Sequence, residues 1–388
     1  MSRAYDDVVL VAPVSFGYAR YSERGVPWFA GRSLAAMLDL AGLDKSAIDG
    51  FAIASFSLSP DTPVSLAEYL GLELRYLEAL PFGGASGVIG VRRAARAVQA
   101  GDADIVACIG ADTLDPDGFG DLVANFSGAT IDASYPYAAG GPNVPFALMT
   151  AAYMERYGAT REDFARISVA QRHNANHCPH ALLRHKPLTL DDCLAAPPIA
   201  EPLHLFDCVM PCAGADGVLV MREARARELG VPAVRLAAAF ECFNAYPDDP
   251  IQLRSGWSRY GAALYEQAGV SSADIDVIET YDDYPVVVML QFEGMQFCGE
   301  GEAARFVREH ALTFDGDGPA HNTSGGQLSV GQAGAAGGYL GLVEAVRQLT
   351  DAAGSHQVRD PRTALVTGFG MINYDRGLCS SAAILERV

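Results

Sequence analysis

GQAGAAGGYLGLVEAVRQL, residues 331–349, is the stretch that decides the fold, because the chain contains a second version of it. Residues 83–101 read GGASGVIGVRRAARAVQAG, again a glycine-rich turn that opens an amphipathic helix. An apolar strand follows each version, at 103–112 and at 363–371. Earlier in each half a short helix leads into another strand, from Lys45 and from Ser271. This internal repeat predicts a chain made of two similar α/β halves.

The predicted strands are apolar throughout, as in DIVACIG at 104–110, which indicates parallel sheets covered by helices on both faces. We expect an N-terminal half over 1–230 and a C-terminal half over 231–388. Between about 112 and 205 the pattern breaks into irregular sequence, including SGATIDASYPYAAGGPN and the amphipathic TREDFARISVAQRHNANH. We interpret this segment as an insertion in the first half, and long insertions in compact domains often carry function.

Composition narrows the class of protein. Half of the 388 residues are hydrophobic, which suits a large enzyme-sized core, and the formal net charge is −19. That charge argues against a nucleic-acid groove or an anionic membrane surface as partner. There is no apolar run of about 18 residues and the N-terminus does not resemble a signal peptide, so we expect a cytoplasmic protein. Eight scattered cysteines indicate reduced thiols and no structural disulfide.

Four motifs carry a resemblance to a known family: GGASG at 83–87, ETYDDYP at 279–285, HNTSGGQLSVGQAGAAGG at 321–338 and VTGFGMINYDRG at 366–377. The third is the most specific. With the duplicated α/β body, the chain resembles the thiolase superfamily over essentially its whole length, in particular the thiolases related to sterol carrier protein and their lipid-transfer-protein-like relatives. The resemblance implies a duplicated thiolase fold of five layers, αβαβα, with an insertion in the first half.

The chain departs from the thiolases where they carry their chemistry. Thiolases place a nucleophilic cysteine at the start of the first glycine-rich helix, where the helix N-terminus favours a thiolate, and the matching position here is Gly84. Their second cysteine is absent from the segment 366–370, and their Gly-His pair is Gly331-Gln332. Thiolysis and Claisen condensation need a covalent acyl-enzyme, so Gly84 removes that route.

The family's His-Asp-x-Phe or Asn-Glu-x-Phe stretch is Tyr281-Asp282-Asp283-Tyr284 in this chain. In this it resembles the cysteine-less steroid side-chain aldolases, which cleave β-hydroxyacyl-CoA esters by retro-aldol chemistry and are thought to use tyrosines. The resemblance implies that Tyr281, helped by Asp282 or Asp283, handles the proton of the β-hydroxyl, with Tyr284 as the alternative acid–base group. Without the resemblance, Tyr281 is better explained as a core aromatic at a strand end.

Retro-aldol cleavage also needs donors that hold the thioester oxygen while it carries negative charge. We expect the backbone amides of Gly84 and Gly370 in this role, together with the side-chain amide of Gln332, which cannot act as a base but can donate a hydrogen bond. A purely structural amide in the glycine-rich turn is the alternative for Gln332.

Coenzyme A is expected as part of the substrate, with no permanently bound cofactor. By resemblance, Ser324, Gly325 and Gly326 of the third motif would line the channel for its pantetheine arm, and His321 and Asn322 of the same motif are further candidates for binding the substrate. The basic residues of the insertion are candidates for its phosphates, with ordinary surface charge as the alternative: Arg172, Arg184, His185 and Lys186.

Some clusters are better explained without chemistry. His173, His177, Cys178 and His180 have the most metal-like spacing, but Pro179 disrupts it and no fourth ligand follows, so we predict no metal site. Cys208 and Cys212 fit buried packing better than catalysis.

Two other functions stay open. One is a β-ketoacyl-CoA thiolase or acyltransferase subunit with an unrecognised nucleophile, and the other is a non-catalytic acyl-CoA-binding or structural subunit. The resemblance further implies a homodimer and a small partner protein with a zinc ribbon and an OB fold.

Overall fold

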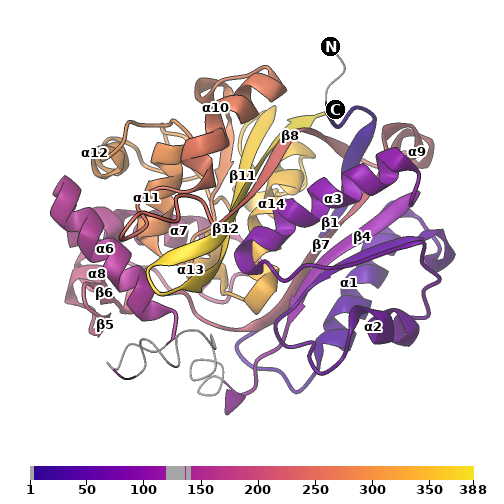
Figure 1. Ribbon diagram of the computed structural model, residues 1–388, viewed down its shortest axis with the longest axis horizontal. Helices are drawn as coiled ribbons and strands as arrows, with labels where there is room; N and C mark the ends of the chain where they lie inside the picture. The colour runs from indigo at the N-terminus through magenta and orange to yellow at the C-terminus, as the bar shows by residue number, and fades with distance from the viewer. Residues whose placement is uncertain (1–3, 119–135, 137–140) are drawn as a thin grey trace.

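The structure is a computed structural model that describes residues 4–118, 136 and 141–388. Two parts of the predicted insertion, 119–135 and 137–140, lie outside the described residues, and with them most of SGATIDASYPYAAGGPN. The described residues form a mixed α/β fold around one ten-stranded sheet (Figure 1). Among the helices of this described part, none has the length and apolar character needed to span a bilayer.

The order of the strands shows the duplication directly. From one edge it is β3-β2-β4-β7-β1 and from the other β10-β9-β11-β12-β8, so each half repeats the same arrangement. The first half contributes β1 (Val8–Ala19), β2 (Gly50–Ala54), β3 (Tyr76–Ala79), β4 (Ile105–Asp112) and β7 (Ala213–Arg222). The second contributes β8 (Ala233–Phe243), β9 (Val277–Glu279), β10 (Ala320–His321), β11 (Thr363–Asn373) and β12 (Arg376–Arg387). A short antiparallel ladder between β1 and β8, centred on Leu10 and Val234, joins the two halves.

The sheet is mixed rather than wholly parallel, which corrects the expectation from the apolar strands. β2 runs parallel to β3 and β4, and β9 runs parallel to β10 and β11, but β7 and β12 are antiparallel to their neighbours. β12 follows β11 through a tight hairpin, which forces antiparallel pairing. Helices cover both faces of the sheet whether its strands are parallel or antiparallel, so an apolar run does not indicate the direction of a strand.

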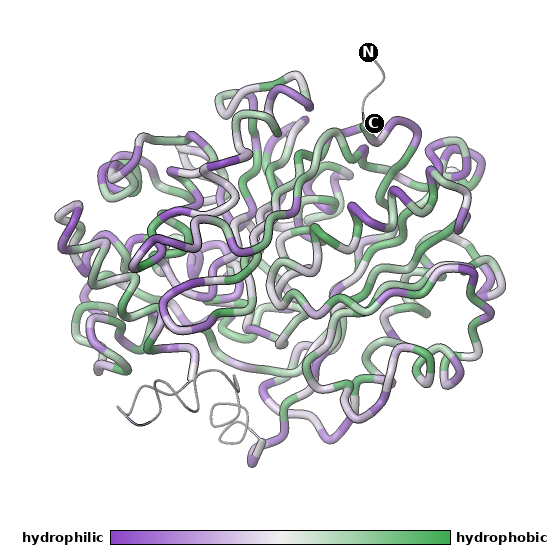
Figure 2. The backbone as a smooth tube through the Cα atoms, in the orientation of Figure 1, coloured by the Kyte–Doolittle hydropathy of each residue, from purple (hydrophilic) through white to green (hydrophobic). Residues whose placement is uncertain are grey.

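Helices and the two halves of the sheet form five layers, αβαβα, as predicted. The two repeat helices, α3 (Ser86–Ala100) and α14 (Gly337–Leu349), contact each other and strands of both halves, so they form the central layer. α1 (Val26–Ala41) covers the outer face of the first half beside α2 (Pro63–Leu70), and α10 (Gly256–Ala268) covers that of the second beside α11 (Pro285–Gly294) (Figure 1). Figure 2 shows hydrophobic residues along the central strands and hydrophilic ones along much of the periphery.

Glycines allow the two central helices to meet. A Cβ atom on Gly87 would overlap the backbone of Gly338, and one on Gly338 would lie 2.7 Å from the carbonyl oxygen of Gly84. Real Cβ atoms essentially never approach other atoms that closely. The two glycine-rich turns are therefore required at the contact between the halves, which is also where the functional residues gather.

The described part of the insertion consists of α6 (Asn143–Tyr157), α7 (Arg161–His177), α8 (Leu190–Ala195) and the short β5–β6 pair (Pro198–Ala200, Leu203–His204). α7 packs on two helices of the second half, α12 (Ala303–Glu309) and α13 (Gly326–Val330). An ion pair between Asp163 and Arg308 fastens α7 to α12 at 2.6 Å. α9 (Glu223–Leu229) connects β7 to β8.

Candidate active site

The four positions that the sequence analysis placed at the centre of the chemistry come together. Gly84 lies in the turn Gly83–Ala85 that leads into α3, and Gly370 lies on β11. Tyr281 follows β9, and Gln332 lies between α13 and the turn Gly334–Ala336 before α14. A Cβ on Gly370 would overlap the carbonyl of Phe82 and lie 2.9 Å from the amide nitrogen of Gly84, so the absence of a side chain lets these two segments touch.

The ring of Tyr281 occupies the space beside Gly84. A Cβ built on Gly84 would overlap Cε2 and Cζ of that ring and the carbonyl oxygen of Phe369. Tyr281 is only 7% exposed, so the ring has little freedom to move outward. The position at which thiolases carry their nucleophile therefore cannot hold a cysteine here unless Tyr281 or the backbone moves.

Gln291 on α11 fixes the backbone of Tyr281 from both sides. The amide of Tyr281 donates to Gln291 Oε1 at 3.0 Å, and Gln291 Nε2 donates to the carbonyl of Tyr281 at 2.7 Å. The hydroxyl of Thr367 on β11 also donates to Gln291 Oε1. Gln291 is fully buried, so these bonds are shielded from water. The ring of Tyr281 thus projects from a rigid base.

The side-chain amide nitrogen of Gln332 makes two hydrogen bonds within the protein. Its Nε2 donates to the Tyr281 hydroxyl oxygen at 3.2 Å and to Gln327 Oε1 at 3.2 Å. Its backbone is held as well, between the carbonyl of Met210 and the amide of Cys212, each at 2.9 Å. An amide nitrogen has two hydrogens, so Gln332 has none left for a thioester oxygen. In this arrangement the amide of Gln332 is placed to orient Tyr281, and its expected oxyanion role stays a prediction.

Tyr281 is a neutral phenol. Burial raises the pKa of its hydroxyl well above 10, and the nearby carboxyl groups of Asp283 and Asp282 raise it further, against a smaller lowering by Gln332 and Gln327. A role as base for the substrate hydroxyl would need the opposite shift. The raised pKa keeps the phenol protonated, which suits a proton donor better than a base, and the part that Tyr281 takes in proton transfer stays a prediction.

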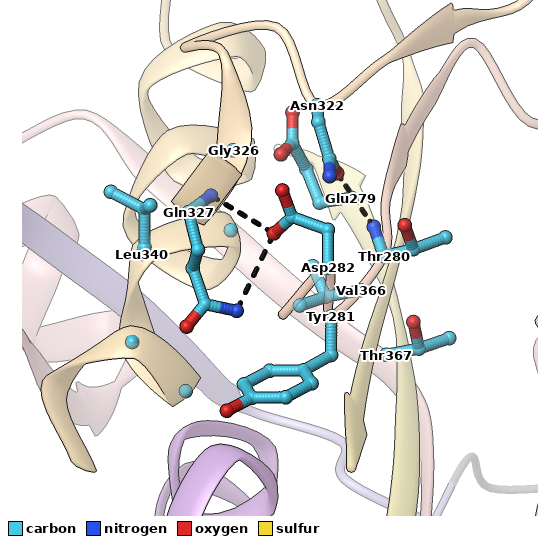
Figure 3. A pocket seen from close by; sticks show the side chains of 13 residues that line it. Glu279, Thr280, Tyr281, Asp282, Asn322, Gly326, Gln327, Leu340, Val366 and Thr367 are labelled. Atoms are coloured by element: carbon cyan, nitrogen blue, oxygen red, sulfur yellow. Dashed lines mark hydrogen bonds between the residues drawn. The ribbon is translucent and has the colours of Figure 1, made fainter. Parts of the chain in front are cut away.

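The two aspartates have different surroundings. Asp282 accepts the backbone amide of Gln327 at 3.0 Å, at the start of α13 (Figure 3). It also accepts the backbone amide of Leu328 at 3.2 Å. Burial raises its pKa to about 6, although these amides oppose the shift. Asp283 Oδ1 is buried with no hydrogen-bond partner among the residues that the structure describes, and burial followed by the charge of Asp282 raises the pKa of its carboxyl. The carboxylate of Asp282 is thus bonded to the start of α13, whereas Asp283 Oδ1 can still accept a hydrogen bond.

The hydroxyl of Tyr284 is bonded to a residue of α6. It donates to Asn143 Oδ1 at 2.5 Å, and its ring stacks on Phe146 with 4.0 Å between centroids. Burial raises the pKa of its hydroxyl well above 10. The proton of Tyr284 is therefore engaged with α6, while the hydroxyl of Tyr281 accepts from Gln332 and keeps its own proton. This difference favours Tyr281 over Tyr284 as the acid–base group.

The third motif packs behind this centre. His321 is fully buried beside Thr280 Oγ1 at 2.7 Å, and burial lowers its pKa to about 3, so the imidazole is neutral. Asn322 accepts the amide of Thr280 at 2.8 Å, Ser324 is fully buried, and Cβ atoms on Gly325 and Gly326 would overlap Ala175 and Asp282. These residues expose almost no surface, so their expected contact with pantetheine remains a prediction.

A narrow cavity of about 10 Å³, roughly the room of one water molecule, lies between this motif and Tyr281 (Figure 3). Its lining includes Glu279, Asp282, Asn322 and Gln327. Gln327 was missed by the sequence analysis although it lies within the third motif, because nothing local shows that it contacts Gln332. Gln291 gave no signal in the sequence, since it is one polar residue in an otherwise apolar helix.

Known proteins resemble this chain over most of its length. The family described as thiolase C-terminal domain-like matches residues 247–386. The 17-hydroxy-3-oxo-4-pregnene-20-carboxyl-CoA lyase of Mycobacterium tuberculosis is 32% identical over 86% of this chain and 88% of its own length. A steroid side-chain-cleaving aldolase of Thermomonospora curvata is also 32% identical, over 86% of this chain and 87% of its own.

The chain belongs to the thiolase superfamily, among its sterol-carrier-protein-2-like aldolases. The structure described as Ltp2-ChsH2(DUF35) aldolase superposes on this aldolase with a TM-score of 0.83 at 27% identity, covering 98% of both chains. The family, fold and lyase class predicted from the sequence are thereby confirmed.

No cysteine of the aldolase replaces the missing nucleophile. All eight are free thiols, and the pKa of each is raised, in every case chiefly by burial. Cys379 donates to the carbonyls of Phe82 and Gly370 at 3.3 Å, beside the centre, and burial raises its pKa to about 12. Thiolate attack requires a lowered pKa, so the thiols of this aldolase are suited to packing.

The four basic candidates divide into one buried and three more accessible residues. Arg172 is 5% exposed and donates to Ser329 Oγ at 3.0 Å and to the carbonyl of Lys186 at 2.9 Å, so it is less accessible than the other three, and its expected contact with a CoA phosphate stays a prediction. Arg184 is half-buried, and His185 and Lys186 are exposed. The positive charge available to a phosphate in this segment therefore comes from the 184–186 turn.

The histidines of α7 serve local packing. His173 Nε2 lies 2.9 Å from Asp315 Oδ1, and His177 packs its ring against Phe314 with 5.1 Å between centroids. Cys178 Sγ contacts the ring of His180. The described ranges hold no group of three or more His, Cys, Asp or Glu residues placed to bind a metal ion.

Proposed function

We propose that this aldolase cleaves the Cα–Cβ bond of a β-hydroxyacyl-CoA thioester by a retro-aldol reaction without a covalent acyl-enzyme. In this reaction the β-hydroxyl loses its proton and becomes a carbonyl, the electrons of the Cα–Cβ bond pass to the thioester as an enolate, and Cα then takes up a proton. The observation that carries the proposal is the phenol of Tyr281 in the space that a nucleophile at Gly84 would need.

In this reaction Tyr281 is the proton donor. Its hydroxyl oxygen already accepts from Gln332, so its proton is free to stabilise the enolate and then to be transferred to Cα. The amide of Gly84, at the start of the central helix layer and next to Gly370, is proposed as a further donor to the thioester oxygen. Preorganised donors of this kind typically contribute about 10²–10³ in rate each.

Asp283 is the group that accepts the proton of the β-hydroxyl. Asp282 is engaged with two backbone amides, whereas Asp283 Oδ1 has no partner among the described residues. The pKa of Asp283 is raised by burial, and a carboxylate with a raised pKa is a stronger base once it is ionised. We therefore propose that Asp283 takes the proton of the β-hydroxyl and returns it to Tyr281 after cleavage.

The surface beside the centre favours a bulky apolar acyl group. Phe56 and Met371 are 45% and 39% exposed, and both would contact a Cβ on Gly83 at 3.4 Å. Two relatives carry steroid substrates in their names, and we propose a steroid-like or similarly large apolar acyl chain for this aldolase. The turn of Arg184, His185 and Lys186 is proposed for the CoA phosphates.

We further propose that the aldolase works as a homodimer with a small partner protein that contains a zinc ribbon and an OB fold. The name of the similar structure joins two components, Ltp2 and ChsH2(DUF35), which supports an assembly of this kind. β3 is the terminal strand of the sheet and thus offers an edge for association.

The experiment is to incubate the purified protein, alone and with such a partner, with matched β-hydroxyacyl-CoA and β-ketoacyl-CoA esters. Release of an aldehyde or ketone with the shortened acyl-CoA, without added free CoA, is expected only from the β-hydroxy esters. Intact-protein mass spectrometry during turnover checks for an acyl adduct. CoA-dependent thiolysis or an acylated cysteine would refute the proposal.

A further inference from the structure

A series of hydrogen bonds connects the carboxylate of Asp282 to the hydroxyl of Tyr281 through two glutamines. Gln327 Nε2 lies 3.4 Å from Asp282 Oδ1, Gln332 Nε2 donates to Gln327 Oε1 at 3.2 Å, and Gln332 Nε2 also donates to the Tyr281 oxygen at 3.2 Å. Figure 3 shows the first of these contacts, with the Gln327 amide between Asp282 and the ring of Tyr281. Each link therefore joins a donor on one residue to an acceptor on the next.

We propose that Asp282 and Gln327 are positioning residues that fix the orientation of the Gln332 amide, and that this orientation keeps the proton of Tyr281 available to the substrate. The inference rests on the proposed function, because it concerns whether the O–H bond of Tyr281 is directed toward the reacting thioester. It adds Gln327, which contacts no substrate in this scheme, to the residues on which turnover depends.

The order of donors follows from the carboxylate. An ionised carboxylate only accepts, so the Gln327 amide must turn its Nε2 toward Asp282 and its Oε1 toward Gln332. Gln332 must then present Nε2 to both Gln327 and Tyr281. If both amides were reversed, two oxygens would face each other at Asp282, and the hydroxyl of Tyr281 would have to donate to Gln332 and lose its free proton.

The surroundings hold the glutamines in place. Gln327 is 1% exposed, and its Oε1 fits against Gly337, where a Cβ would overlap it. The backbone amide of Gln327 donates to Asp282 as well, so the same carboxylate fixes both the main chain and the side chain of this residue. Other carboxyls near Asp282 are those of Glu279 and Asp283, and neither supplies a donor to Gln327 in the structure.

Two variants test the proposal. Gln332→Glu has the same shape, but an ionised carboxylate can only accept, so Tyr281 would have to donate to it. We expect a fall in kcat of about 100-fold or more near pH 8, with KM changed by less than about 3-fold. When the introduced carboxyl is protonated it can again donate, so activity relative to the unmodified protein should rise as the pH falls from about 8 toward 6. Loss of packing alone would not produce this recovery.

Gln327→Met keeps the volume but removes the link, so Gln332 can rotate, and we expect a fall in kcat of about 10-fold. Gln267→Glu makes the same chemical change at an exposed position of α10 and is the matched control. If Gln332→Glu keeps the kcat and pH profile of the unmodified protein, the inference is overturned while the proposed function stands.

A second measurement does not depend on activity. The ¹³Cζ resonance of Tyr281, assigned by its loss in Tyr281→Phe, reports whether the phenol oxygen accepts or its proton is donated. We expect it to shift in Gln332→Glu and Gln327→Met and not in Gln267→Glu. An unchanged resonance in both site variants would overturn the inference even if no ester is cleaved and the proposed function itself fails.

Discussion

Gly84→Ala is the substitution for which the structure makes its sharpest prediction. The new methyl group would overlap Cε2 and Cζ of Tyr281 and the carbonyl oxygen of Phe369. The ring cannot simply rotate away, since Gln291 holds its backbone at 2.7 and 3.0 Å and Gln332 holds its hydroxyl at 3.2 Å. The variant must therefore displace Tyr281, shift the backbone, or both.

The size of the effect follows from these two routes. Forcing a methyl group into a filled core costs typically about 1–3 kcal/mol of folding stability. If the strain is relieved by moving Tyr281, a displacement of about 1 Å of a catalytic group can lower the rate about 100-fold. We expect a loss of about 2 kcal/mol in the free energy of unfolding together with a kcat at or below about one hundredth of the original value.

Urea unfolding and steady-state cleavage of a β-hydroxyacyl-CoA ester measure the two effects. Gly25→Ala is the control, because a Cβ there meets only Pro27 at 3.6 Å. In a Tyr281→Ala background the ring is gone, so Gly84→Ala should cost less stability, with a coupling energy of about 1 kcal/mol or more. If the costs of the two substitutions simply add, the two residues do not share one space and the reasoning is refuted.

Four further outcomes are expected. Tyr281→Phe should lower kcat about 10²–10⁴-fold while acyl-CoA binding, measured by calorimetry, is retained; turnover near the original rate would exclude Tyr281 as the acid. Tyr284→Phe should cost about 1 kcal/mol in urea unfolding through loss of its bond to Asn143 and change kcat only a few-fold, whereas a loss like that of Tyr281→Phe would make Tyr284 the acid–base group. Burial raises the pKa of Asp216 from 3.8 to about 6, so the folded state binds more protons than the unfolded state between these pH values. The free energy of unfolding should therefore fall as the pH rises through this range, by about 3 kcal/mol for this group. Unfolding curves at several pH values should show a flatter dependence for Asp216→Asn, and an unchanged slope would contradict the prediction. Iodoacetamide at about pH 7.5 should leave the cleavage rate unchanged, because burial raises the pKa of every thiol, and rapid inactivation would point to a reactive cysteine.

The fold was predictable because its signal is local. The glycine-rich turns at 83–87 and 331–338 each open a helix that must approach the other closely, and a sequence records such a requirement as glycine. Strand direction was not predictable, since β7 and β12 are buried on both faces and look like parallel strands in sequence. Their antiparallel pairing is decided by connections and neighbours that no apolar pattern specifies.

The site was predictable in its membership more than in its roles. Tyr281 and Gln332 stand at motif positions, so the sequence could place them together. Their roles depend on contacts between distant segments: both hydrogens of Gln332 are taken up by Gln327 and Tyr281, and the hydroxyl of Tyr284 is taken up by Asn143, which is 141 residues away. The burial that keeps the phenol of Tyr281 protonated is likewise a property of the assembled layers, and so is the burial of Arg172.

Because Gly84 and Tyr281 share one space, we expect that no single substitution gives this chain the nucleophile of a thiolase. A thiol at position 84 needs the volume that the phenol ring now fills, so Gly84→Cys alone yields a misplaced tyrosine and a crowded thiol rather than a thiolase. Removing the ring alone leaves an empty space with no nucleophile and no acid. Each single step loses the existing activity before the other chemistry can appear, and the helix start that would activate a thiolate instead lies against a neutral phenol.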